Sequence, residues 1–136
     1  MSNVEKLRAA YRTWHDTRGQ NSDAWFDLFT DDVTIRSLAD GAPGMEFSAL
    51  RRGKADVGRY FADLAADWEM LFYHAQEFVA EGERVVMIGR CGWRHKKTGK
   101  EVETPVFAYW NFREGKVAEY FEFYDTAKAF AATQPG

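Results

Sequence analysis

The stretch VAEYFEFYD, residues 117–125, decides the fold because aromatic rings alternate along it on both sides. Successive side chains of a β-strand point to opposite faces. One face therefore carries Ala118, Tyr120, Glu122 and Tyr124, and the other carries Glu119, Phe121, Phe123 and Asp125. A sheet wetted on one side would show one polar face. The stretch instead predicts a strand covered on both faces, with Glu122 as a carboxylate in an apolar pocket.

The composition restricts the class of protein. A chain of 136 residues can form one domain, 1–136, with a full core. Its single cysteine, Cys91, rules out an intramolecular disulfide and a zinc cluster built on cysteine. The net charge of −3 and the lack of a coherent basic face argue against a nucleic-acid partner. No apolar run could span a membrane, and residues 1–6 lack the apolar core of a signal peptide, so we expect a cytoplasmic protein.

The order of elements predicts an α+β domain. Helical spacing predicts a helix over residues 3–18, a short one around Trp25 and a third from about 53 to 68. A strand over 33–38 and a glycine-rich loop over 39–52 lie between the second and third helices. Tight turns then separate a four-stranded antiparallel meander, roughly 69–80, 84–96, 101–112 and 116–125, before a short helix at 126–132. We expect a cone-shaped curved sheet, made of the meander plus the N-terminal strand, covered by the three main helices.

The chain resembles the nuclear transport factor 2-like superfamily, and within it the SnoaL-like and ketosteroid-isomerase-like proteins. The resemblance rests on the order and spacing of LFTDDVTI, RGKADV, EGERVVMIG, TGK and FREGKVAEYFEFYD. It implies an α+β cone, usually a dimer, with a pocket between sheet and helices. It does not imply one function, because members include isomerases, cyclases, epoxide hydrolases, dehydratases and binding proteins.

The resemblance assigns site residues position by position. Where ketosteroid isomerases carry two catalytic carboxyl groups, this chain has Ser37 and Ala108. Their helix tyrosine matches Tyr11. We therefore expect no ordinary ketosteroid isomerase activity. Limonene epoxide hydrolases carry a last-strand Asp at a position matched by Glu122, but their Arg-x-Asp is not reproduced around Arg90.

Hairpin geometry suggests partners for Glu122. Three-residue loops at 81–83, 97–99 and 113–115 would align His74, Arg90, Val106 and Glu122 in one row. Arg90 and Glu122 would then meet over Val106, although one β-bulge would break the row. A glutamate in an apolar pocket has a raised pKa and can act as a general acid or base. The alternative is that Glu122 forms a structural ion pair.

Further polar and aromatic residues are candidates for holding a substrate. Ser37 is predicted to be a hydrogen-bonding group in the pocket wall, because no base that would activate it is evident. The rings lie on helix and sheet faces that would surround the pocket, with ordinary core packing as the alternative; the set is Tyr11, Trp14, Tyr60, Trp68, Trp110, Tyr120 and Tyr124. No histidine spacing indicates a metal site, and we expect neither a metal nor an organic cofactor.

Three functions fit these observations. The first is a SnoaL-like enzyme that uses acid–base chemistry on an apolar substrate, cyclic molecules included, with Glu122, His74 and Arg90 in the catalytic row. The second is a binding protein for a hydrophobic ligand. The third is a dimerisation module. The face opposite Glu122 carries an aromatic patch that no remaining segment would cover, which predicts a homodimer through the convex sheet face; the patch consists of Phe107, Tyr109, Phe121 and Phe123.

Overall fold

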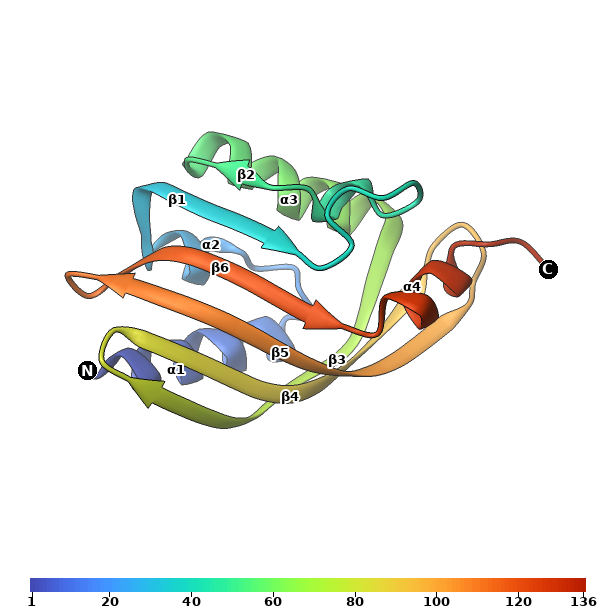
Figure 1. The fold of residues 1–136 in the computed structure, drawn as a ribbon. Helices are drawn as coiled ribbons and strands as arrows, with labels where there is room; N and C mark the ends of the chain where they lie inside the picture. The colour runs from blue at the N-terminus through green and yellow to red at the C-terminus, as the bar shows by residue number, and fades with distance from the viewer.

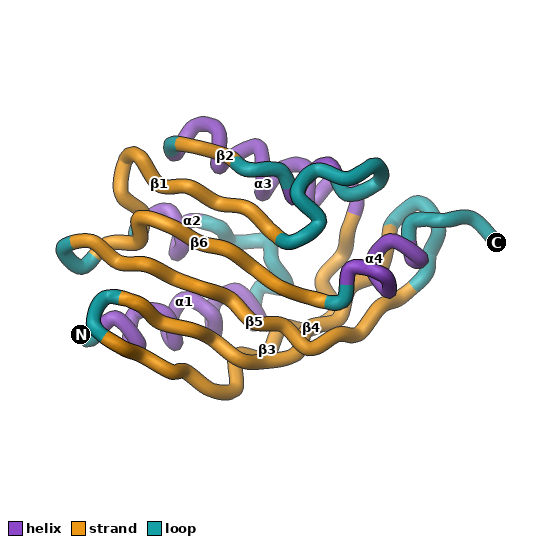
Figure 2. The backbone as a smooth tube through the Cα atoms, viewed as in Figure 1, coloured by secondary structure: helices purple, strands orange, loops and turns teal.

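A six-stranded sheet forms the body of the molecule in the computed structural model, which describes residues 1–136. The strands are β1 (Phe29–Ser37), β2 (Arg51–Arg52), β3 (Trp68–Glu81), β4 (Arg84–His95), β5 (Glu101–Arg113) and β6 (Lys116–Tyr124). Their order is β2-β1-β6-β5-β4-β3, and only the β1–β6 pair is parallel. The predicted α+β cone with its antiparallel meander is confirmed, and Figures 1 and 2 show the strong bend of the sheet.

The main helices cover one face of this sheet. They are α1 (Asn3–Asp16), α2 (Asp23–Phe26) and α3 (Lys54–Asp67), and Figure 1 shows all three on the same side. We call this side the concave face and the other side the convex face. No helix lies over the convex face of β4, β5 and β6 (Figure 1). The short helix α4 (Thr126–Ala132) follows β6 at one end of the sheet.

Local sequence explains why α1 forms and which way it faces. Ser2 accepts a hydrogen bond from the Glu5 amide, and the Glu5 carboxylate accepts one from the Ser2 amide. This capping box satisfies the free amides at the helix start. The buried positions Leu7, Ala10, Tyr11 and Trp14 recur at helical spacing and pack against the concave face.

The hairpin registers differ from the predicted ones. The β5–β6 turn contains two residues, Glu114 and Gly115, both with positive φ, so Arg113 pairs with Lys116. A bulge after Asn111 changes the register again. Glu122 therefore lies opposite Ala108 and not Val106, while Phe107 lies opposite Phe123.

The β4–β5 register is also shifted, by one residue. The His95 amide donates to the carbonyl of Lys100 at 2.8 Å and so closes a turn of four residues, 96–99, where a turn of three was predicted. Arg90 therefore pairs with Pro105, and Gly89 takes the place opposite Val106. His74 does pair with Arg90, as predicted, because a bulge in β3 compensates for a shorter turn. A one-residue shift sends alternating side chains to the other face, so the predicted row is wrong.

Candidate active site

A cavity of about 70 Å³ lies between the concave face and the helices. At roughly 10–15 Å³ of accessible volume for each water, the cavity has room for about five waters. Its wall is almost wholly apolar, and 19 of its 21 lining residues are hydrophobic. The other two are Thr104 and Glu122. A single carboxylate thus faces an aromatic pocket.

Two tyrosines hold one oxygen of that carboxylate. Tyr73 Oη, on β3, donates to Glu122 Oε2 at 2.5 Å, and Tyr120 Oη, two residues before Glu122 on β6, donates to the same oxygen at 2.6 Å. Glu122 Oε1 accepts no hydrogen bond from the protein. Oε2 is therefore fixed, while Oε1 is the oxygen free to meet a ligand.

Burial dominates the electrostatics of the pocket. It raises the pKa of Glu122 above its ordinary value, because an apolar site disfavours the charged form. The hydrogen bonds from Tyr120 and Tyr73 oppose that rise without cancelling it. Burial and the nearby charge of Glu122 raise the pKa values of Tyr11, Tyr73 and Tyr120, so these phenols stay protonated donors.

The neighbours of Glu122 in the sheet give it room and a second polar group. Ala108 lies opposite it on β5 and is fully buried, so no large side chain fills the space there. Ser37 lies beside it on β1 and is also fully buried. Ser37 Oγ and Tyr124 Oη are 2.9 Å apart and share a hydrogen bond. Ser37 therefore lies behind the cavity wall and holds the hydroxyl of Tyr124, which lines the cavity.

Aromatic contacts join the sheet wall of the cavity to the helices α1 and α2. Trp110 Nε1 donates to Tyr11 Oη at 2.9 Å, and the Trp110 ring stacks on Trp25 with centroids 5.1 Å apart. Because Tyr11 Oη accepts this bond, its own hydroxyl proton is available to a ligand.

The structure places most of the predicted residues around the cavity. The lining includes Tyr11, Trp14, Tyr60, Trp68, Trp110, Tyr120, Glu122 and Tyr124. Their role in substrate binding stays a prediction. Ser37 lies behind the wall, as described above.

His74 and Arg90 are the exceptions. Both side chains are exposed, neither lines the cavity, and Arg90 lies 3.8 Å from Glu103 in an ion pair. The one-residue shift in β4 turns Cys91 inward in place of Arg90. The predicted contact of Arg90 and His74 with Glu122 is therefore wrong. Burial and the charge of Glu122 raise the pKa of the Cys91 thiol, so it stays neutral.

Tyr73 was missed by sequence reasoning. It lies 49 residues before Glu122 in the sequence and on the far edge strand. The sequence holds one indication of its position. The buried residues of the strand change from even to odd numbers, because Trp68 and Met70 are buried and the next buried residue is Tyr73. That change marks the bulge observed between Met70 and Phe72.

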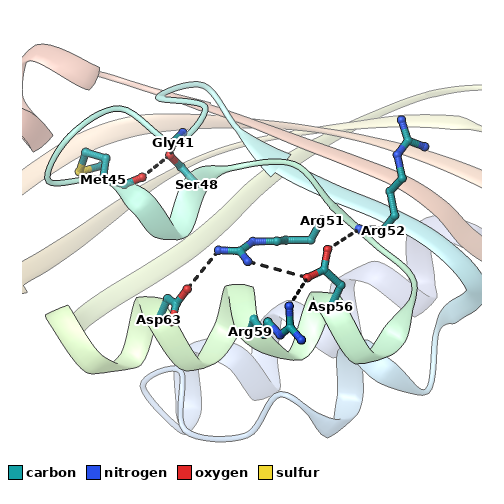
Figure 3. Close-up of polar contacts among 8 residues, drawn as sticks. All are labelled: Gly41, Met45, Ser48, Arg51, Arg52, Asp56, Arg59 and Asp63. Carbon is teal, nitrogen blue, oxygen red and sulfur yellow. Dashed lines mark hydrogen bonds and ion pairs between the residues drawn. The ribbon is translucent and has the colours of Figure 1, made fainter.

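The loop over residues 38–50 brings two more apolar residues, Met45 and Phe47, to the cavity. Figure 3 shows how it is fixed: Ser48 Oγ accepts from the Gly41 amide and donates to the Met45 carbonyl. Just beyond the loop, Arg51 lies 3.1 Å from Asp63 and 3.8 Å from Asp56, both on α3 (Figure 3). These ion pairs tie the end of the loop to the helix beneath it.

Neither a cluster of metal-ligating side chains nor a helix able to span a membrane occurs in the structure. No three His, Cys, Asp or Glu side chains lie together as a metal site requires. None of the helices has the length and apolar character needed to cross a bilayer.

Comparisons with known proteins agree with this fold. A family model described as a SnoaL-like domain matches residues 7–120. No curated protein sequence matches the chain. Several solved structures have the same fold. One is an NTF2-like protein of unknown function from Burkholderia pseudomallei, with 20% identity, a TM-score of 0.86, and 98% of this chain and 99% of that chain covered.

Two further structures are described by a ligand or an activity. TerC co-crystallised with polyporic acid shares 20% identity at a TM-score of 0.83, with 96% and 97% of the two chains covered. A SnoaL-like polyketide cyclase from Mesorhizobium loti, so described on a provisional basis, shares 17% identity at a TM-score of 0.74, with 91% of this chain and 100% of that chain covered. Identities this low establish the shared fold alone.

Proposed function

Because the chain belongs to the SnoaL-like domain family, we propose that it performs acid–base chemistry on an apolar small molecule, cyclic molecules included, with Glu122 as the proton-transfer group. The reaction would be of the isomerase, cyclase, dehydratase or epoxide hydrolase class. In each of these reactions a carboxylate takes a proton from carbon or water, or returns one.

One observation carries this proposal: a carboxylate with a raised pKa has one oxygen held by two tyrosines and the other unbonded in an apolar cavity. A base works best when its pKa lies near the working pH and its reactive atom is fixed. Burial raises the pKa of Glu122 in the direction of the first condition, and the two tyrosines supply the second. The Tyr11 hydroxyl would donate to a polar group of the substrate.

The sheet register also distinguishes this site from ordinary ketosteroid isomerases. Ser37 and Ala108, which match their carboxyl positions, lie on either side of Glu122 in the same row. The one carboxylate is thus on the strand between those two positions. A base moved by one strand, about 4.8 Å, would meet a different substrate atom. We accordingly propose that steroid isomerisation is not the reaction.

The test uses a probe that reports a base without knowledge of the natural substrate. A nitro-substituted benzisoxazole loses its ring C–H proton to a base while its N–O bond breaks, and it gives a coloured cyanophenolate. The protein should accelerate this reaction above the rate with acetate, and Glu122→Gln should lower the acceleration about 100-fold. The rate should rise with pH through the raised pKa of Glu122, because only the carboxylate form accepts the proton.

The control is Glu119→Gln, the same change on the same strand but on the opposite face. It should leave the rate unchanged. Equal rates for the unmodified protein and Glu122→Gln would contradict the proposed catalysis.

The apolar lining favours a second candidate, a binding protein for a hydrophobic ligand. Naphthalene binding, followed by quenching of tryptophan fluorescence, tests it independently. Binding that is unchanged by Glu122→Gln, without any proton transfer, would support this second candidate.

We also propose a homodimer formed through the convex face. Phe107 and Phe123 lie opposite each other and are 46% and 41% exposed. They form one patch with Tyr109 and Phe121, which are partly buried. A two-fold axis would bury this patch on both copies.

A further inference from the structure

Two residues of α1 hold Tyr73, the residue that donates to Glu122. Tyr11 and His15 are four positions apart and therefore lie on the same side of the helix. The Tyr11 ring stacks on the Tyr73 ring, with centroids 5.5 Å apart and planes at 19°. His15 Nδ1 accepts a hydrogen bond from the Tyr73 backbone amide at 3.1 Å. One face of α1 thus contacts both the ring and the backbone of Tyr73.

The Tyr73 amide is available because β3 is an edge strand of the sheet. An edge strand leaves a row of backbone groups without a partner strand. A bulge lies just before Tyr73, between the pairs made by Met70 and Phe72. At this irregular point of the edge, His15 supplies the acceptor that a neighbouring strand would supply elsewhere.

The contacts form a continuous chain from the surface to the pocket. His15 is partly exposed, Tyr73 is 2% exposed, and Tyr73 Oη donates to Glu122 Oε2 at 2.5 Å. We infer that His15 is a positioning residue, which fixes β3 so that the Tyr73 hydroxyl reaches Glu122. The inference rests on the proposed function for its role in catalysis, but not for its geometry.

The bond requires a particular form of the imidazole. Because Nδ1 accepts, it carries no proton, and the neutral ring must carry its proton on Nε2. The charged and titratable groups around it are Asp16 at the end of α1, Arg18 in the turn that follows, and His74 on β3, whose ring centroid is 4.5 Å away. Burial, Arg18 and His74 lower the pKa of His15, and Asp16 opposes them. Neutral solution therefore keeps the acceptor, and acidification removes it.

The test compares three variants by NMR. His15→Phe keeps an aromatic ring and removes the acceptor, while His15→Asn puts a carbonyl oxygen near the place of Nδ1. His74→Phe is the matched control, because it changes the ring beside His15 and leaves the bond intact. The two readouts are hydrogen exchange at the Tyr73 amide and the titration of the Glu122 carboxyl carbon.

His15→Phe should speed exchange at Tyr73 about tenfold relative to Val106 in the central strand β5. It should also move the Glu122 titration to higher pH, because a hydroxyl that stabilises the carboxylate is displaced. His15→Asn should restore most of both values, and His74→Phe should change neither. Equal losses in His15→Phe and His15→Asn would overturn the inference, since the acceptor would then not be the property that matters.

A measurement on the unmodified protein covers the case in which a variant fails to fold. The nitrogen shifts of His15 should show a bare Nδ1 and a protonated Nε2 at neutral pH, and a proton on Nδ1 would overturn the inference. None of these readouts needs a substrate. An inactive protein in which His15 has the expected nitrogen shifts would therefore count against the proposed catalysis alone. If His15→Phe changes neither the Tyr73 amide exchange nor the Glu122 titration, the result would count against the role of His15 alone.

Discussion

Both faces of strands β5 and β6 carry aromatic residues, but the two faces differ in chemistry. On the concave face, Trp110 and Tyr120 pack beside Glu122, and each ring has a polar atom. On the convex face, Phe121 and Phe123 lie with centroids 4.4 Å apart, and neither ring has one. Phe107 extends this patch.

The difference shows what each face can do. Rings with a hydroxyl or an indole N–H can hold a buried carboxylate, because they satisfy its hydrogen bonds while they exclude water. Rings without a polar atom cannot make such hydrogen bonds and are covered best by apolar groups or by a cation. The rings beside Glu122 therefore suit the concave face to chemistry, whereas the convex patch, in which only Tyr109 has a hydroxyl, is suited to association.

The largest expected effect is the loss of packing on the concave face. Trp110→Ala should lower the free energy of unfolding by about 3–5 kcal/mol, because Trp110 is 2% exposed and contacts Trp25, Tyr11 and Tyr120. Phe107→Ala, on the same strand, should cost less than about 1 kcal/mol at low protein concentration. Urea unfolding of both variants measures the difference, and equal losses would refute the distinction between the two faces.

The next effect concerns the association of the convex face. Phe107→Glu combined with Phe123→Glu should convert the expected dimer to monomers or to insoluble protein, because charges replace the two exposed rings that face each other. Light scattering at micromolar concentration measures the mass. If the unmodified protein is monomeric, the convex patch does not form a homodimer interface and the prediction fails.

A smaller effect isolates the charge on the concave face. The pKa of Glu122 is raised in the folded protein, so the folded state binds its proton more tightly than the unfolded chain. This contribution is fully present below the unfolded pKa of about 4.3 and is lost as the pH rises through the folded pKa. Each unit of difference corresponds to about 1.4 kcal/mol.

Glu122→Gln should therefore stabilise the protein at neutral pH. The gain should vanish in acid, where Glu122 is already neutral. Thermal unfolding across pH measures it, and Glu119→Gln again serves as the control. A variant less stable than the parent at neutral pH would show that the two tyrosine bonds outweigh burial.

The smallest effect is a cation–π contact on the convex face. The Arg36 guanidinium lies 3.8 Å from the centroid of Phe121. Arg36→Gln should cost about 0.5–1 kcal/mol in the isolated chain. Arg52→Gln, at an exposed position on the neighbouring strand β2, should cost less. If the loss at Arg36 grows with protein concentration in urea titrations, the contact is part of the association surface.

Much of the fold follows from local patterns in the sequence. Alternation along residues 117–125 placed Glu122 and Tyr120 on one face and Phe121 and Phe123 on the other, and the structure confirms this. Such a prediction needs only the two-residue period of a strand. The pocket aromatics follow for the same reason, because helical or strand periodicity assigns each to a face.

Register is where the prediction failed. It depends on the backbone of a few turn residues, and Glu114 adopts a positive φ of 51° that the sequence does not announce. The resulting two-residue turn, together with the bulge after Asn111, shifts the partner of Glu122 by two positions. In β4 a shift of one residue exchanges Arg90 for Cys91 at the pocket. A register shift of two residues leaves each side chain on its predicted face, whereas a shift of one residue moves it to the other face.

The two hydrogen bonds that Glu122 Oε2 accepts from Tyr73 and Tyr120 have a stereochemical consequence. The carboxyl group cannot rotate about its last carbon–carbon bond without breaking both hydrogen bonds. Oε1 therefore meets a flat substrate from one side only. Under the proposed function, turnover in deuterated water should place the label on a single prochiral face of the product, and the handedness of that product would be set by the two tyrosine hydroxyls.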